Sequence, residues 1–254
     1  MIAALQMYDW PEIRDATDEW WRGLAGHLGV DAGLSRPDDF TAPWFADDLV
    51  FGQTCGYPFT HALKGRVACV ATPHYAADGC VGPDYCSILF ARENLPLPAF
   101  RDRVAAVNTP DSMSGMLALK LVFAPYAERG RFFARAIETG GHLASLAAVR
   151  EGRADVCAID CVCVALAQRY RPDALAGLSP IARSPSVPGL PFITRAGDPA
   201  RLREGLSQAF ADTGLASARD ALLLSGFSVL DQASYGRITA LEDAMEKAGG
   251  LSLI

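Results

Sequence analysis

The turn Asn108–Gly115, with its aspartate, two serines and glycine, has the composition of an anion-binding loop. It follows the apolar run 104–107, which predicts a buried strand, and it precedes a second apolar run that predicts a buried helix. The first turn of such a helix has free N–H groups and the positive end of the helix dipole, so an anion can bind there without Lys or Arg. The hydroxyls of Ser112 and Ser114 would add two donors. The alternative is that Asp111 or Ser112 only caps the helix and nothing binds.

Two further polar positions are predicted to follow strands in the same way. His142 comes after two glycines at a predicted helix start, with Ser145 one turn further on. Two helix N termini would then face one anion, with His142 as a hydrogen-bond donor or, below about pH 6.5, as a cation. Asp160 directly follows the predicted strand 154–159, and its carboxylate would accept a proton from a partly ionised oxyanion or pair with a ligand amine. The ordinary alternatives are first-turn residues for His142 and Ser145, and a helix cap for Asp160.

Three tyrosines are candidates for closing the site. Tyr8 ends the first predicted strand, Tyr57 follows the second, and Tyr85 lies at a point where the chain crosses between lobes. A tyrosine offers an apolar face and one hydroxyl, but each of these is equally compatible with packing. Cys161 and Cys163 are not expected to act as a redox or metal pair, since residues i and i+2 do not face each other on a helix.

The elements that must position these residues alternate between strand and helix. The predicted strands are 2–8, 49–53, 66–71, 85–92, 104–107, 132–138 and 154–159, and the predicted helices are 11–28, 113–124, 142–151, 161–169, 199–211, 216–224 and 234–247. This order favours an α/β fold with parallel sheets. Proline-rich crossings suggest two lobes, one of residues 1–84 and 186–254, the other of residues 85–185. Ligands of such sheets bind beyond the carboxyl ends of the strands, here between the lobes.

Composition excludes several other classes of protein. The 254 residues carry a formal charge of -6, which argues against nucleic acid as a partner, and no run of about 18 apolar residues predicts a membrane span. The seven cysteines form no CxxC pair and only four histidines accompany them, so neither a metal nor another cofactor is expected. Free thiols favour a reducing compartment. The start of the chain has no basic leader, which predicts either a cytosolic protein or one whose leader has been replaced.

Several runs of the sequence are similar to those of one family. They are "VNTPDSMSGMLAL", "ETGGHLASLAAVREGRADVCAIDCVCVAL", "PSVPGLPFIT", the opening "LQMYDWPEIRDA" and the crossing "GPDYCSILFAR". Together they resemble the PhnD-like phosphate, phosphite and phosphonate substrate-binding proteins of ABC transporters over nearly the whole chain. The resemblance implies an α/β, type II periplasmic-binding fold, in which two Rossmann-like lobes joined by two crossing segments form a clamshell.

The resemblance also implies which residues bind the ligand. By their match to the family's motifs, these are Tyr8, Tyr57, Tyr85, Ser112, the backbone N–H of Met113, Ser114, His142 and Asp160. Met113 stands where transport proteins often carry a small hydroxyl residue, so one donor is lost.

The function implied is that of a monomeric solute-binding protein that performs no chemistry. It would close on a small oxyanion and be recognised by the membrane component of an ABC transporter, with a periplasmic location despite the missing leader. The alternative is a cytosolic enzyme on the same fold, similar to chorismate dehydratase or to the thiamine-pyrimidine synthase family.

Overall fold

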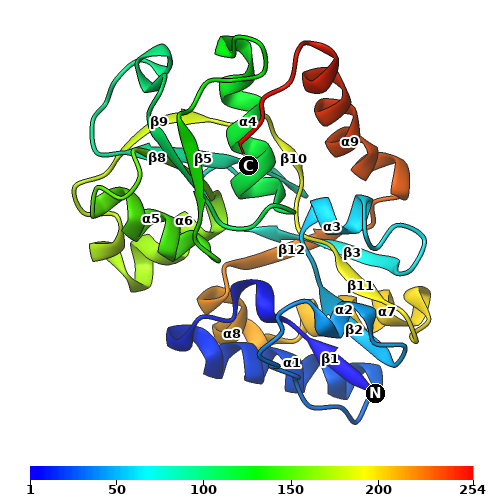
Figure 1. The fold of residues 1–254 in the computed structure, drawn as a ribbon. Coiled ribbons are helices and arrows are strands. Elements are labelled where there is room, and N and C mark those ends of the chain that lie inside the picture. The colour runs from blue at the N-terminus through cyan, green and yellow to red at the C-terminus, as the bar shows by residue number, and fades with distance from the viewer. Residues whose placement is uncertain (254) are drawn as a thin grey trace. The chain divides into compact units, whose positions relative to one another are not determined.

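The computed structural model describes residues 1–253, which divide into two compact units. Unit 1 consists of residues 1–76, 81–83 and 188–235, and unit 2 of residues 77–80, 84–187 and those from 236 onward. Each unit is an α/β structure built on its own five-stranded sheet (Figure 1).

Unit 1 has a mixed sheet in the order β1-β2-β11-β3-β12. Its strands are β1 (Ile2–Ala4), β2 (Leu49–Gln53), β3 (Ala68–Tyr75), β11 (Phe192–Thr194) and β12 (Leu224–Ser228). The sequence pattern predicts a parallel sheet, but only β1 and β2 pair in parallel, whereas β11 and β12 run antiparallel to their neighbours. β12 was not expected at all, because its first residue was assigned to the end of a helix.

Five helices of unit 1 are described, and the longest of them has the predicted apolar stripe. They are α1 (Arg14–Leu28), α2 (Ala42–Phe45), α3 (Gly56–Thr60), α7 (Pro199–Ala211) and α8 (Ala216–Ala221), with short 3₁₀ turns at Gln6–Tyr8, Pro11–Ile13 and Thr213–Leu215. In α1, Trp20, Leu24 and Leu28 lie one turn apart and are buried, and the helix packs against α7 and α8. Gly29 ends the helix in the left-handed conformation, at φ 64°.

Unit 2 has a second mixed sheet, in the order β7-β6-β8-β5-β9. Its strands are β5 (Ser87–Ala91), β6 (Val104–Val107), β7 (Arg135–Glu138), β8 (Val156–Asp160) and β9 (Ser179–Arg183). β6, β7 and β8 are parallel, while β5 and β9 are antiparallel to their neighbours. Every residue of β5 and β8 is buried, which explains why both strands are apolar along almost their whole length.

Helices follow the parallel strands of unit 2. They are α4 (Ala118–Phe123), preceded by a π-helical turn at Met113–Leu117, α5 (His142–Arg150) and α6 (Cys161–Tyr170), with 3₁₀ turns at Leu97–Phe100, Ala124–Tyr126 and Pro172–Ala174. Short strands β4 (Asp84–Tyr85) and β10 (Val187–Pro188) pair where the chain passes between units.

The C-terminal segment belongs mainly to unit 2, not to the first lobe as the sequence pattern suggested. α9 (Gln232–Lys247) starts in unit 1 and continues in unit 2. Leu251 and Leu253 then enter the core of unit 2 together with Phe123 and Phe132. Burial of these two leucines stabilises the placement by roughly 2 kcal/mol each.

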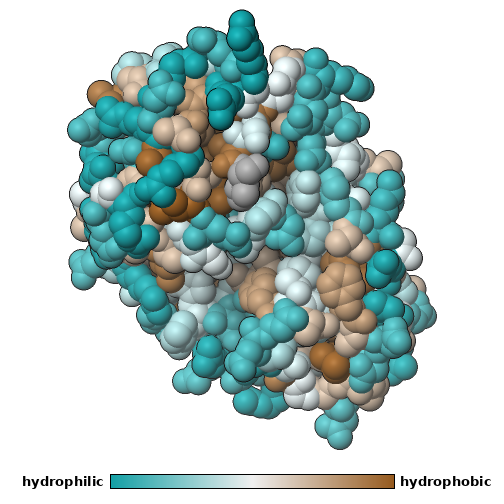
Figure 2. All heavy atoms as spheres, viewed as in Figure 1, coloured by the Kyte–Doolittle hydropathy of each residue, from teal (hydrophilic) through white to brown (hydrophobic). Residues whose placement is uncertain are grey.

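The surface is mainly polar. On the face drawn in Figure 2, hydrophilic side chains predominate and apolar ones form small groups. The large apolar side chains that the structure exposes are Met1, Phe40, Phe45, Val81 and Val229. None of the described helices is both long and apolar enough to cross a membrane.

Candidate functional site

The serine-rich turn adopts an unusual first helical turn. Ser112 is the N-cap, and its Oγ accepts a hydrogen bond from the Gly115 N–H at 3.0 Å. The Leu117 N–H then bonds to the Ser112 carbonyl at 3.0 Å, which gives the wider π-helical spacing. A Cβ atom on Gly115 would lie 1.8 Å from Asn108 Oδ1, so only glycine fits there. The capping role predicted as the alternative for Ser112 is therefore present, although its hydroxyl hydrogen can still be donated.

The turn meets a second loop at the same edge of the sheet. Thr139 N bonds to the Val107 carbonyl at 2.9 Å, and Gly140 N bonds to the Asn108 carbonyl at 2.8 Å. Gly140 has φ 83°, a conformation that favours glycine, and it turns the chain into α5. These bonds join the ends of β6 and β7, so they place the starts of two helices side by side.

Ser114 and His142 are brought together by this arrangement. Ser114 Oγ lies 2.9 Å from His142 Nε2, and Ser114 is buried. The Nδ1 atom of His142 is sealed from solvent and has no hydrogen-bond partner in residues 1–253, and the same holds for Asn108 Oδ1. Two polar atoms without partners thus flank the paired turns.

The ring of His142 is neutral at physiological pH. Burial lowers its pKa to about 4, against a weaker opposing interaction with the backbone of Ala158. The sequence suggested a cation below about pH 6.5, and the structure moves that change to more acidic pH. His142 as a whole residue is partly exposed, and an anion close to the ring would raise the pKa again.

Asp160 ends β8 at the same carboxyl edge of the sheet and is buried. Its Oδ1 accepts hydrogen bonds from Val162 N at 2.7 Å and Cys163 N at 3.4 Å, so it caps α6. The cap occupies one carboxylate oxygen, and a role in binding remains a prediction.

The predicted tyrosines fall in different units. Tyr85 is buried on β4 of unit 2, whereas Tyr8 and Tyr57 belong to unit 1. Tyr57 lies on α3, and its ring stacks on His61 with centroids 3.9 Å apart. Tyr8 lies on a 3₁₀ turn and not at a strand end as predicted, and it meets the ring of Tyr75 edge-on at 5.2 Å.

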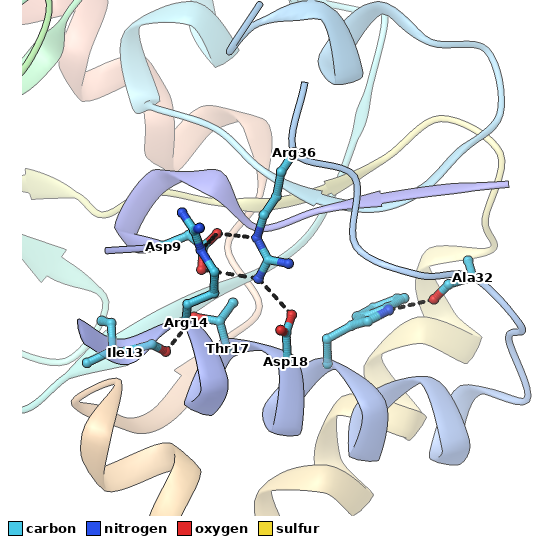
Figure 3. A network of polar contacts seen from close by, with 8 residues as sticks. Asp9, Ile13, Arg14, Thr17, Asp18, Ala32 and Arg36 are labelled. Carbon is cyan, nitrogen blue, oxygen red and sulfur yellow. Dashed lines mark hydrogen bonds and ion pairs between the residues drawn. The ribbon is translucent and has the colours of Figure 1, made fainter. Parts of the chain in front are cut away.

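An ion-pair network holds the segment that follows Tyr8 (Figure 3). Arg36 bonds to Asp9 through Nε and to Asp18 at 2.7 Å, and Arg14 lies 3.7 Å from Asp9. The hydrogen bond to Asp9 is the main cause of a raised pKa for Arg36. The network therefore ties Asp9, the residue after Tyr8, to α1 and to Arg36.

Two residues that support the site were missed by sequence reasoning. The Asn108 carbonyl accepts a hydrogen bond from Gly140 N, and Thr139 Oγ1 lies 2.7 Å from Ser145 Oγ and donates to the Val107 carbonyl at 3.0 Å. Both lie directly after a strand, which is the signal that could have found them. Among the described residues, no group of three or more His, Cys, Asp or Glu is placed to hold a metal ion.

Comparisons with known proteins identify the family. A sequence model described as "ABC transporter, phosphonate, periplasmic substrate-binding protein" matches residues 45–244. The chain belongs to this family. It is therefore a solute-binding protein of ABC transporters, and the alternative of an enzyme is not supported. Its relatives are periplasmic proteins with a small ligand and a membrane partner.

Solved structures share the fold of this chain, which is the α/β fold of type II periplasmic-binding proteins. A binding protein component of an ABC phosphonate transporter from Pseudomonas aeruginosa has a TM-score of 0.79 at 18% identity, over 98% of this chain and 87% of the other. PhnD1 from Prochlorococcus marinus, in complex with methylphosphonate, has a TM-score of 0.76 at 14% identity, over 97% and 98%. A Xanthomonas citri protein bound to ATP has a TM-score of 0.70 at 18% identity, over 98% and 97%. Among proteins of curated function, none is similar enough to count as a match.

Proposed function

We propose that this protein binds a small phosphonate, phosphate or phosphite and delivers it to an ABC uptake system, as a monomer in the periplasm. The oxyanion is held by Ser112, the Met113 N–H, Ser114 and His142. The contact between Ser114 and His142 carries the proposal, because it joins two helix starts at the carboxyl edge of one sheet. Tyr8, Tyr57, Tyr85 and Asp160 are proposed contacts that rest on the resemblance to the family.

The chemistry of the paired turns favours a small anion of low charge. Residues 108–115 and 139–142 include no Lys or Arg, so the donors are hydroxyls and backbone N–H groups, with the neutral imidazole of His142 beside the Ser114 hydroxyl. Such dipoles stabilise one or two negative charges without an opposite charge nearby. A triphosphate, such as the ATP bound by the Xanthomonas citri protein, would need further positive charge.

A thermal-shift screen tests the proposal directly. Phosphate, phosphite, methylphosphonate, 2-aminoethylphosphonate and ATP are each added to the purified full chain. A ligand that binds only the native state raises the melting temperature by mass action, and a hundredfold excess over Kd adds about 2.7 kcal/mol. We expect a small oxyanion to give the largest shift. If none of the four small oxyanions raises the melting temperature, whether or not ATP does, the proposed ligand class is wrong.

A further inference from the structure

Three thiols of unit 2 gather beside one glycine. Cys80 lies in the short segment 77–80, Cys86 just before β5, and Cys161 at the start of α6. The Sγ atoms of Cys80 and Cys161 are 3.5 Å apart. A Cβ atom on Gly79 would come within 2.9 Å of Cys86 Sγ and 3.2 Å of Cys161 Sγ, so the glycine at φ 105° lets the segment approach both.

We propose that Cys80 and Cys161 form a disulfide when the protein meets a disulfide oxidant. The two sulfurs need to approach by only about 1.5 Å to reach a bond length of about 2.05 Å. Their neighbours are well fixed, because Cys161 N bonds to the Cys86 carbonyl at 3.1 Å and Asp78 forms an ion pair with Arg183.

Exposure decides the order of events. Cys80 is partly exposed, whereas Cys86 and Cys161 are buried. Hydrogen bonding to the Cys80 thiol, together with burial, raises the pKa of Cys161, so Cys161 is the poorer first nucleophile. Cys80 therefore attacks an oxidant such as oxidised glutathione, forms a mixed disulfide and releases one glutathione thiol.

Cys161 then completes the exchange. Its sulfur loses a proton and attacks the Cys80 sulfur of the mixed disulfide, which releases the second glutathione thiol. Two protein thiols are oxidised to one disulfide, and the oxidant's disulfide is reduced to two thiols. The bond fixes segment 77–80 to the residue that directly follows Asp160.

Mass spectrometry of the full chain tests this assignment. The reduced protein is treated with oxidised glutathione, denatured and alkylated with N-ethylmaleimide, so the seven cysteines should give five adducts, seven minus two. A protease that cleaves before aspartate releases Cys80 in the peptide 78–83, apart from the other cysteines, and Cys161 in the peptide 160–172. We expect these two peptides to be linked.

Single variants distinguish the bond from its alternatives. Cys80→Ser should abolish the 78–83 link, while Cys86→Ser and Cys163→Ser should keep it. Cys69→Ser is the matched control, since Cys69 is also partly exposed but lies in unit 1. Seven adducts in the oxidised wild type, or a link from the peptide of Cys86 in place of 78–83, would overturn the proposal.

Discussion

Ser114→Ala is the most informative single change, because the two roles of this hydroxyl give separate readouts. Ser114 is buried, and its Oγ is bonded to His142 Nε2 at 2.9 Å. Removal leaves a histidine nitrogen without its partner, which costs about 1 kcal/mol of folding free energy. For a chain of this size that corresponds to a fall of roughly 2–4 °C in melting temperature.

The effect on binding should be larger. When His142 Nε2–H donates to Ser114, the serine hydroxyl hydrogen is free to point at the ligand. A hydrogen bond to a charged group contributes about 1.5–3 kcal/mol. Its loss therefore raises Kd by roughly tenfold to 150-fold. A bound anion would favour the tautomer with Nε2–H. In the other tautomer, the Ser114 hydroxyl donates to Nε2 and turns an oxygen lone pair toward the anion.

Isothermal titration calorimetry with the best oxyanion of the thermal-shift screen measures this change. Ser179→Ala is the matched control. Ser179 is a partly buried serine of unit 2, but it pairs with Ala91 at the opposite end of β5 from Asp160. We expect its Kd to stay within twofold of the wild type. If Ser114→Ala also stays within twofold while its melting temperature falls, the hydroxyl is structural only and the proposed site is wrong.

Three further predictions concern the same edge of the sheet. The pKa of His142 is lowered from 6.5 to about 4, so the unfolded chain binds this proton more tightly than the folded one. The free energy of unfolding should therefore fall by about 1–2 kcal/mol, allowing for partial exposure, as the pH drops from roughly 6.5 to 4. In urea unfolding, the stability of His142→Asn should depend less on pH over this range than that of the wild type. Asp160→Asn keeps a good N-cap but removes the charge, so calorimetry should show a selective loss of affinity for 2-aminoethylphosphonate over methylphosphonate, and equal losses would contradict an amine contact. Gly115→Ala forces a Cβ against Asn108 and should destabilise the protein by about 1–3 kcal/mol. Gly141→Ala is the control and should not destabilise it, because this position has open space and an extended backbone. Equal melting temperatures of the two variants would refute this packing.

Local patterns predicted much of the fold. The apolar stripe of α1, the glycine that ends it and the strand over residues 49–53 are found where the sequence placed them. The strand-turn-helix order around residues 104–123 was also correct, since periodicity reports burial directly. The prediction of parallel strands was wrong for part of each sheet. β5, β9, β11 and β12 are antiparallel to their neighbours, and periodicity of side chains along one strand contains no information about direction.

Pairings between distant parts of the chain were similarly out of reach. The C-terminal leucines join the core of unit 2 through long-range packing, which a short apolar run cannot specify. The sequence predicted that two helix N termini would face one anion, but not the direct hydrogen bond between Ser114 and His142. The wider π-helical turn that presents Ser114 depends on the close approach of Asn108 to Gly115, and no residue pattern predicts such a contact.

The unpartnered atoms at this edge argue that the turns are built for binding more than for stability. A buried polar atom without a hydrogen bond costs roughly 1–3 kcal/mol, and both Asn108 Oδ1 and His142 Nδ1 lack partners in residues 1–253. A fold selected for stability alone could replace either residue by an apolar one of similar size. Both residues sit next to two helix starts whose donors are uncharged. Under the proposed function, a protonated or hydrated oxyanion would complete these hydrogen bonds and offset the lost stability.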